Sequence, residues 1–129
     1  RGFLMNAFAH DLAQAGEFWL AKFSFEENDG RYKVRPVLVL ESKPFGTKVA
    51  FCGTQKLDTT ASRTEVLLED DEAMRVGLQR AGRICFANHR VISRADMMRK
   101  IGSLGAPGEK LSTLKFREMA QAVQAAGVL

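Results

Sequence analysis

The sequence feature that most constrains the fold is the stretch Arg35-Pro36-Val37-Leu38-Val39-Leu40. Its last four residues are apolar without a break, which indicates a strand that packs on both faces. A proline cannot donate to a sheet ladder, so Pro36 belongs at the first residue of the strand or on a sheet edge. Arg35 therefore lies at the mouth of a rigid strand, where a cation either builds an anion site or only marks the end of the strand.

The length of 129 residues predicts one domain with its own core. We expect residues 1–15 to be an N-terminal extension, either helical or added to the natural chain, and residues 16–129 to form a single domain. Cys52 and Cys85 lie in apolar runs, as small buried residues do, and nothing around them resembles a disulfide framework or a zinc site. The chain has no run of about 18 apolar residues. These observations favour a cytoplasmic protein with no membrane span and no cofactor.

Charge is unevenly distributed, although the net charge is only +4. Residues 65–72 form an acidic run, and basic residues dominate residues 75–100, where Asp96 is the only acid. Such a distribution attracts phosphate backbones. A solvated surface whose two halves neutralise each other explains the same pattern.

Short apolar and aromatic runs separated by turn residues predict six strands, at residues 17–25, 34–41, 47–55, 64–68, 82–92 and 97–104. A short helix is expected over residues 70–78 and a long one over residues 109–126, where apolar residues repeat at helical spacing. In the first strand, Trp19, Ala21, Phe23 and Phe25 share the face that we expect to be the core face. This order predicts a mainly β (α+β) fold, with a small antiparallel, barrel-like sheet and the terminal helix packed on it.

The side chains available for chemistry fit oxyanion binding better than any nucleophilic triad. Only His10 and His89 could act as an imidazole base, and no two-histidine spacing supports a metal. Arg35 at a strand start, Thr54 at a strand end and Asn88 with His89 near the end of another strand are groups that bind phosphate. RNA cleavage needs little more, because the ribose 2′-hydroxyl is supplied by the substrate.

Several stretches resemble the MazF/PemK-type toxins of bacterial toxin–antitoxin pairs. Gly16-Glu17-Phe18-Trp19-Leu20 resembles the family's opening motif, and Arg35 to Leu40 is similar to its second strand. Val49 to Thr54 resembles its third strand, which ends in threonine, and weaker similarity covers Arg90-Val91-Ile92 and Arg99 to Leu104. The resemblance extends over residues 16–126.

This resemblance implies an SH3-like barrel and a metal-independent endoribonuclease that cuts single-stranded RNA to a 2′,3′-cyclic phosphate and a 5′-hydroxyl. It also implies a homodimer and a cognate antitoxin that blocks the RNA groove. The active-site residues of the family correspond to Arg35, which would stabilise charge on the phosphate, and Thr54, which would hold the phosphate or the RNA backbone. We expect five further residues to support RNA binding: Lys33, Gln55, Asn88, His89 and Arg90.

The chain departs from the family pattern at one strand. Some members carry Arg-x-Asp where this sequence has Cys85-Phe86-Ala87, so both charged groups are missing. Asn88 and His89 are the candidates to replace them. The alternative hypothesis is a catalytically degenerate member that binds RNA, or binds a protein target as the CcdB-type toxins do. Binding to double-stranded DNA has only the basic residues in its favour, because no recognition-helix motif is present.

Overall fold

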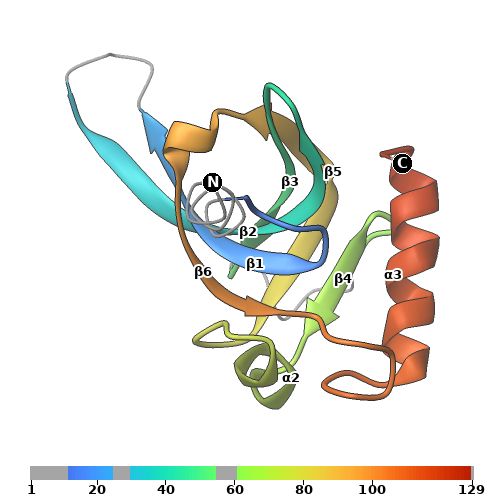
Figure 1. Cartoon of the computed structure of the whole chain (residues 1–129). Helices are drawn as coiled ribbons and strands as arrows, with labels where there is room; N and C mark the ends of the chain where they lie inside the picture. The colour runs from blue at the N-terminus through green and yellow to red at the C-terminus, as the bar shows by residue number, and fades with distance from the viewer. Residues whose placement is uncertain (1–11, 25–29, 55–60, 129) are drawn as a thin grey trace, which may run out of the picture.

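The computed structural model describes residues 12–24, 30–54 and 61–128. Six antiparallel strands form one sheet in the order β4-β5-β3-β2-β1-β6 (Figure 1). The strands are β1 (Glu17–Ser24), β2 (Tyr32–Lys43), β3 (Gly46–Gly53), β4 (Glu65–Leu68), β5 (Gly82–Ile92) and β6 (Met97–Ser103). The helices are α2 (Asp70–Arg75), the single-turn η1 (Arg94–Asp96) and α3 (Thr113–Ala126).

The predicted mainly β architecture is confirmed, and the ends of each strand lie within two residues of the expected ones. The sheet curls strongly, as twisted antiparallel sheets do, and wraps around the centre of the molecule (Figure 1). Within the described chain its edge strands, β4 and β6, are not paired with each other. The fold is therefore a barrel-like sheet that stays open between these two strands.

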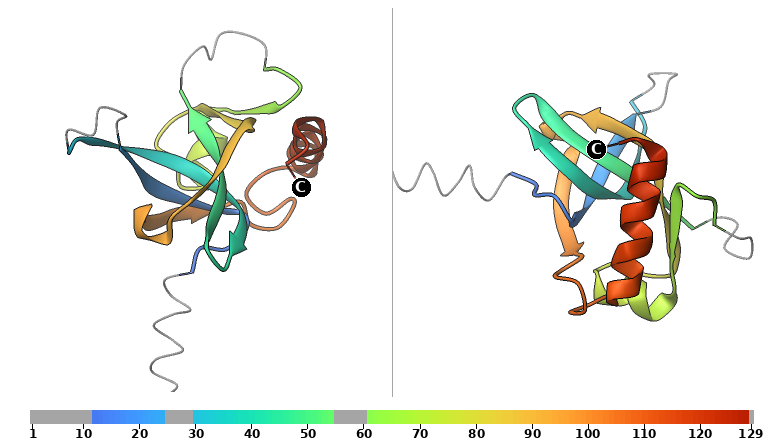
Figure 2. Two further views of the ribbon diagram at one scale, coloured as in Figure 1. Left: turned by 90° about the horizontal axis from the view of Figure 1, so that it is seen from above. Right: turned by 90° about the vertical axis from the view of Figure 1, so that its right-hand side faces the viewer.

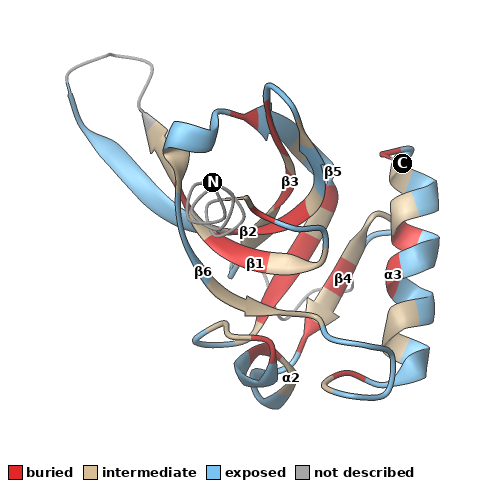
Figure 3. Ribbon diagram, viewed as in Figure 1, coloured by how far each residue is buried: buried red, intermediate tan, exposed pale blue. Residues whose placement is uncertain are grey.

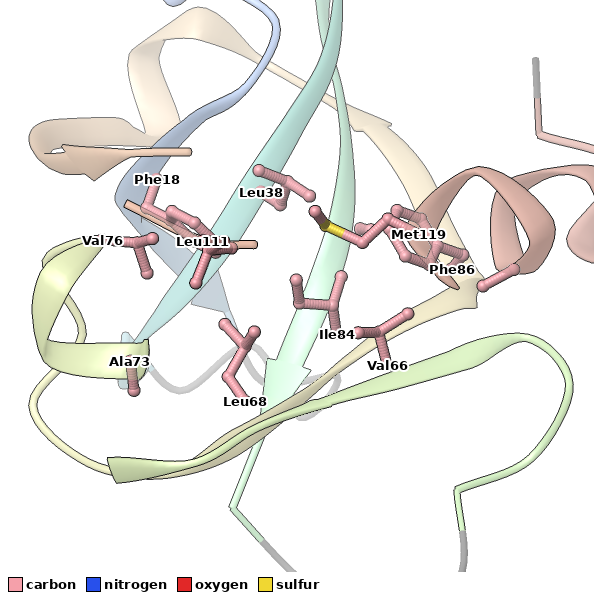
Figure 4. Packing of buried hydrophobic residues seen from close by; sticks show 12 residues of the cluster. Phe18, Leu38, Val66, Leu68, Ala73, Val76, Ile84, Phe86, Leu111 and Met119 are labelled. Atoms are coloured by element: carbon pink, nitrogen blue, oxygen red, sulfur yellow. The ribbon is translucent and has the colours of Figure 1, made fainter. Parts of the chain in front are cut away.

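Both faces of the sheet are buried, each in its own apolar cluster. The helix-facing cluster joins Phe18, Leu38 and Phe86 of the sheet to Leu111 and Met119 of the C-terminal region (Figure 4). The second cluster lies on the opposite face and is made of seven buried residues: Ala13, Trp19, Ala21, Val37, Val39, Val49 and Ile92. The expectation of a single core face for the first strand was therefore incomplete, because Phe18 is fully buried on the other face.

Helix α3 covers the helix-facing cluster beside β4 and β5 (Figure 2). Its buried residues, Met119 and Ala122, face the sheet, while the outer side of the helix is exposed (Figure 3). The helix begins at Thr113, four residues later than predicted, because the Ser112 hydroxyl accepts from the Lys115 N–H at 3.0 Å and caps it. It ends before Gly127, which has a left-handed conformation.

The segment after α2 lies in close backbone contact with β6. A Cβ on Gly77 would lie 2.1 Å from the carbonyl oxygen of Ile101, and one on Gly102 would lie 1.8 Å from that of Val76. Gly77 also has a φ of +101°, which other residues rarely adopt. Only glycine fits at these two positions, and the contact brings the α2–β5 loop against the edge strand β6.

Candidate anion pocket

A pocket of about 520 Å³ opens at one end of the sheet. It lies where β1, the first half of β2, the end of β3, the α2–β5 loop with the first residue of β5, and the middle of β6 meet. The residues that line it are Leu20, Val34, Arg35, Pro36, Cys52, Gly53, Thr54, Gly77, Leu78, Gln79, Arg80, Gly82, Arg99, Lys100 and Ile101.

The structure brings Arg35 and Thr54 together in this pocket. Strands β2 and β3 are antiparallel, with Val37 opposite Phe51. Continuing this register sets Arg35 opposite Gly53, the neighbour of Thr54 in the chain. Both Arg35 and Thr54 are exposed, so a ligand in solution can reach them. Their catalytic role remains a prediction.

The pocket is strongly basic. Arg80, Arg99 and Lys100 join Arg35 in its lining, and none of the described residues that line it is an Asp or a Glu. Among the residues that the structure describes, no carboxylate lies within ion-pair distance of Arg35, Arg80 or Arg99. Like charges gathered in a concave site raise the local concentration of anions, so the pocket favours a negatively charged ligand.

Lys100 differs from the other three cations because it has a carboxylate partner. Its Nζ lies 3.0 Å from Oε2 of Glu17, whose other oxygen accepts from the Gln14 N–H and from Trp19 Nε1, each at 2.9 Å. Burial alone would raise the pKa of Glu17, but these hydrogen bonds and Lys100 outweigh it and hold the pKa below its usual value of 4.5. Glu17 is therefore ionised at neutral pH and fixes Lys100 in the pocket wall.

The described residues that line the pocket include no histidine, and their one cysteine, Cys52, is not a reactive thiol. Burial raises the pKa of Cys52 to about 12, so its sulfur stays protonated and is a poor nucleophile. The remaining polar side chains of the lining are guanidinium groups, the Lys100 ammonium, the Gln79 amide and the Thr54 hydroxyl. Such a set can bind and stabilise an oxyanion but supplies no conventional nucleophile.

Among the described residues, the other residues predicted to bind RNA do not line the pocket. Lys33 is exposed on β2, opposite Phe23. Asn88, His89 and Arg90 follow an irregularity in β5, where the register jumps from Cys85 opposite Phe51 to His89 opposite Ala50. Arg90 lies over the ring of Phe51, 5.2 Å from its centroid, outside the pocket lining. Gln55 lies outside the described residues.

Of the four cations among the described residues that line the pocket, three were not predicted from the sequence to be site residues. Arg80 lies on a loop and Arg99 and Lys100 lie on an edge strand, and only the tertiary fold brings them beside Arg35. The available signal was their position near glycines, because Gly77 and Gly82 flank Arg80 and Gly102 follows Lys100. Glycines that allow close backbone contact can mark segments that meet in space.

The strand with Cys85-Phe86-Ala87 has an ion pair beside it. Arg83 Nη1 lies 3.1 Å from Glu65 Oε1, and the Cys85 thiol donates to Oε2 of Glu65 at 3.6 Å. The Ser62 N–H also donates to Glu65 and, with Arg83, holds the pKa of this carboxyl below its usual value. Burial and the Glu65 carboxylate raise the pKa of Cys85, so this thiol also remains protonated.

Within residues 12–24, 30–54 and 61–128, no group of three or more His, Cys, Asp or Glu side chains could hold a metal ion. In the same ranges, no helix is long and apolar enough to span a bilayer.

Comparison with known protein families matches residues 14–126 to the family described as "PemK-like, MazF-like toxin of type II toxin-antitoxin system". Comparison with curated protein sequences gives no significant match.

Solved structures share the fold. The "Mycobacterium tuberculosis toxin MazF-mt6" is 22% identical, with a TM-score of 0.57 over 86% of this chain and 97% of that chain. An "Endoribonuclease from Mycobacterial species" is 11% identical, with a TM-score of 0.60 over 91% of this chain and 92% of that one. An "Endoribonuclease in complex with its cognate antitoxin from Mycobacterial species" is 12% identical, with a TM-score of 0.58 over 91% and 97% of the two chains.

Proposed function

Because the chain belongs to the PemK-like, MazF-like toxin family of type II toxin–antitoxin systems, we propose that it is a toxin that cleaves single-stranded RNA without a metal ion. The single observation that supports this activity most is the shared pocket of Arg35 and Thr54. Two proteins of similar fold are named endoribonucleases, which agrees with the proposal.

The proposed reaction uses the nucleophile of the substrate. The ribose 2′-oxygen attacks the adjacent phosphorus, and the bond from phosphorus to the 5′-oxygen breaks. The 2′-hydroxyl loses its proton to water, and the leaving 5′-oxygen takes one from water. The products are a 2′,3′-cyclic phosphate and a 5′-hydroxyl.

The protein's part in this reaction is electrostatic. Negative charge grows on the phosphate oxygens as the new bond forms, and the Arg35 guanidinium stabilises it there. A guanidinium is hard to deprotonate, so Arg35 acts as a fixed cation and not as a base. The Thr54 hydroxyl donates a hydrogen bond to the phosphate or the RNA backbone and holds it in line.

The test is cleavage of mixed-sequence single-stranded RNA in the presence of a chelator. We expect Arg35→Ala to lower kcat by about 10²- to 10³-fold, the usual loss for one charge-stabilising donor. Arg117→Ala is the matched control, because it removes an exposed arginine of α3 that does not line the pocket. Unchanged cleavage by Arg35→Ala, with its thermal unfolding also unchanged, would exclude this site.

A degenerate RNA-binding or protein-binding member is the second candidate. The observation that favours it is the neutral segment Cys85-Phe86-Ala87, where some relatives carry charges. Wild-type protein that binds RNA but leaves it intact would support this candidate and exclude the nuclease.

We further propose that the chain forms a homodimer and is inhibited by a cognate antitoxin. A neighbour of similar fold is described in complex with its antitoxin. An acidic antitoxin segment would complement the basic pocket. Sedimentation of the purified chain tests the dimer, and competition between RNA and the antitoxin for binding tests the inhibition.

A further inference from the structure

The cations of the pocket approach it from two sides of the sheet. Leu20 of β1 lies opposite Pro36 of β2 on one side and opposite Arg99 of β6 on the other. Residues directly opposite each other share a face of the sheet, so these three form one row across three strands. Arg35 lies opposite Ala21 in the next row, on the other face. Arg99 and Arg35 therefore belong to different parts of the pocket.

The loop that carries Arg80 is fixed on both sides of this residue. Before it, Gly77 is packed against the backbone of Ile101. After it, the Ala81 N–H donates to Oδ1 of Asp70 at 2.8 Å. Asp70 begins α2, whose first turn is closed by a capping box between Glu69 and Glu72. Arg80 is exposed and lines the pocket on a segment that is held on both sides of it.

We propose that Arg80 and Arg99 form a second phosphate subsite, which binds the phosphodiester next to the one that Arg35 and Thr54 engage. The inference rests on the proposed function and extends it, because it makes substrate recognition depend on two consecutive phosphates. Neither guanidinium has a carboxylate partner among the described residues. A pocket of about 520 Å³ is also in the size range that encloses a ligand as large as a nucleotide.

The first test neutralises one phosphate at a time. A short RNA that spans a cleavage site is made with an uncharged methylphosphonate at the linkage on the 5′ side or on the 3′ side of the cut. For wild-type protein, one of these two substitutions lowers kcat/KM about tenfold, as expected for loss of a charge-assisted contact. For Arg80→Ala, kcat/KM with normal RNA falls by a similar factor, and the same methylphosphonate causes no further loss.

Two outcomes of that test overturn the subsite. In one, neither methylphosphonate changes kcat/KM of the wild-type protein. In the other, the losses from Arg80→Ala and from each methylphosphonate multiply, so that Arg80 and the neighbouring phosphate act independently.

The second test measures binding and does not require cleavage. The Kd of fluorescent mixed-sequence single-stranded RNA is measured at several salt concentrations. Arg80→Ala and Arg99→Ala each reduce the slope of log Kd against log salt by about 0.7, the value for one phosphate contact on single-stranded nucleic acid. Arg80→Lys restores the slope, and Arg117→Ala leaves it unchanged. If both pocket variants keep the wild-type slope, the subsite is overturned. If the variants reduce the slope as expected but the wild-type protein does not cleave the RNA, only the proposed nuclease activity is overturned.

Discussion

Lys115 and Arg99 are both basic residues beside the sheet, but their surroundings are opposite. Lys115 Nζ donates to the carbonyl of Leu67 at 2.9 Å and lies 3.6 Å from Glu72 and 3.4 Å from Glu118. Arg99 lines the pocket and has no carboxylate partner in the described part of the chain. A cation enclosed by partners stabilises the packing of α3, while one left without partners at a concave surface is available to a ligand.

The largest expected effect comes from adding a methyl group at the close backbone contact between β6 and the α2–β5 loop, which forms part of the pocket wall. Gly102→Ala places a Cβ within 1.8 Å of the Val76 carbonyl oxygen, so β6 and the α2–β5 loop must separate. We expect the free energy of unfolding to fall by about 3 kcal/mol, at the upper end of overpacking costs, as measured by urea denaturation.

Gly53→Ala is the control for this experiment, because nothing lies within 4 Å of a Cβ at Gly53. We expect it to leave the free energy of unfolding within about 0.5 kcal/mol of the wild-type value. A similarly small loss for Gly102→Ala would show that the wall is not held by this contact.

The next effect tests the comparison directly. Lys115→Ala leaves the Leu67 carbonyl and the largely buried carboxylate of Glu72 without this partner, and we expect a loss of about 2 kcal/mol in the free energy of unfolding. RNA affinity should not change. Arg99→Ala should show the reverse, with weaker RNA binding and a stability change within about 0.5 kcal/mol. If both variants lose stability equally, the distinction between the two surroundings is wrong.

The smallest effect concerns pH. The folded-state pKa values of Glu17 and Glu65 lie below the usual 4.5. Their contribution to stability is therefore fully present above that pH and is lost as the pH falls through their folded pKa values. We expect the free energy of unfolding to decrease below about pH 4.5, and to do so less steeply in the double variant Glu17→Gln/Glu65→Gln. If the free energy of unfolding falls equally steeply with pH in the two proteins, these two carboxyls do not contribute to the pH dependence.

Much of the sheet could be predicted from the sequence because local signals set it. Alternating apolar residues and turn chemistry such as Pro44 before Gly46 define strands without tertiary information. The burial of Phe18 could not be predicted in this way, because it depends on which face α3 covers. The start of α3 was misplaced because the residues after Gly108 form a turn, in which the Gly108 N–H donates to the Leu111 carbonyl at 2.8 Å.

The candidate site likewise contains residues that could be predicted from the sequence and residues that could not. Arg35 and Thr54 were selected from their places at strand ends and given roles by the family resemblance, and the register of β2 and β3 brings them together. Arg80 and Arg99 could not be identified, because their meeting depends on the backbone contact between Gly77 and Gly102 and not on any motif. Asn88 and His89, chosen for their place in a strand, lie beyond an irregularity in β5 that no local pattern indicates.

The position of Arg99 and Lys100 on an edge strand has a consequence for solubility. An unpaired edge offers backbone hydrogen-bonding groups to any other extended chain, and charged side chains along it discourage such pairing. These two residues lie in the middle of β6, so a second molecule that adds its own β6 there would bring like charges together. We expect the double variant Arg99→Ala/Lys100→Ala to aggregate at concentrations where each single variant stays monodisperse in light scattering.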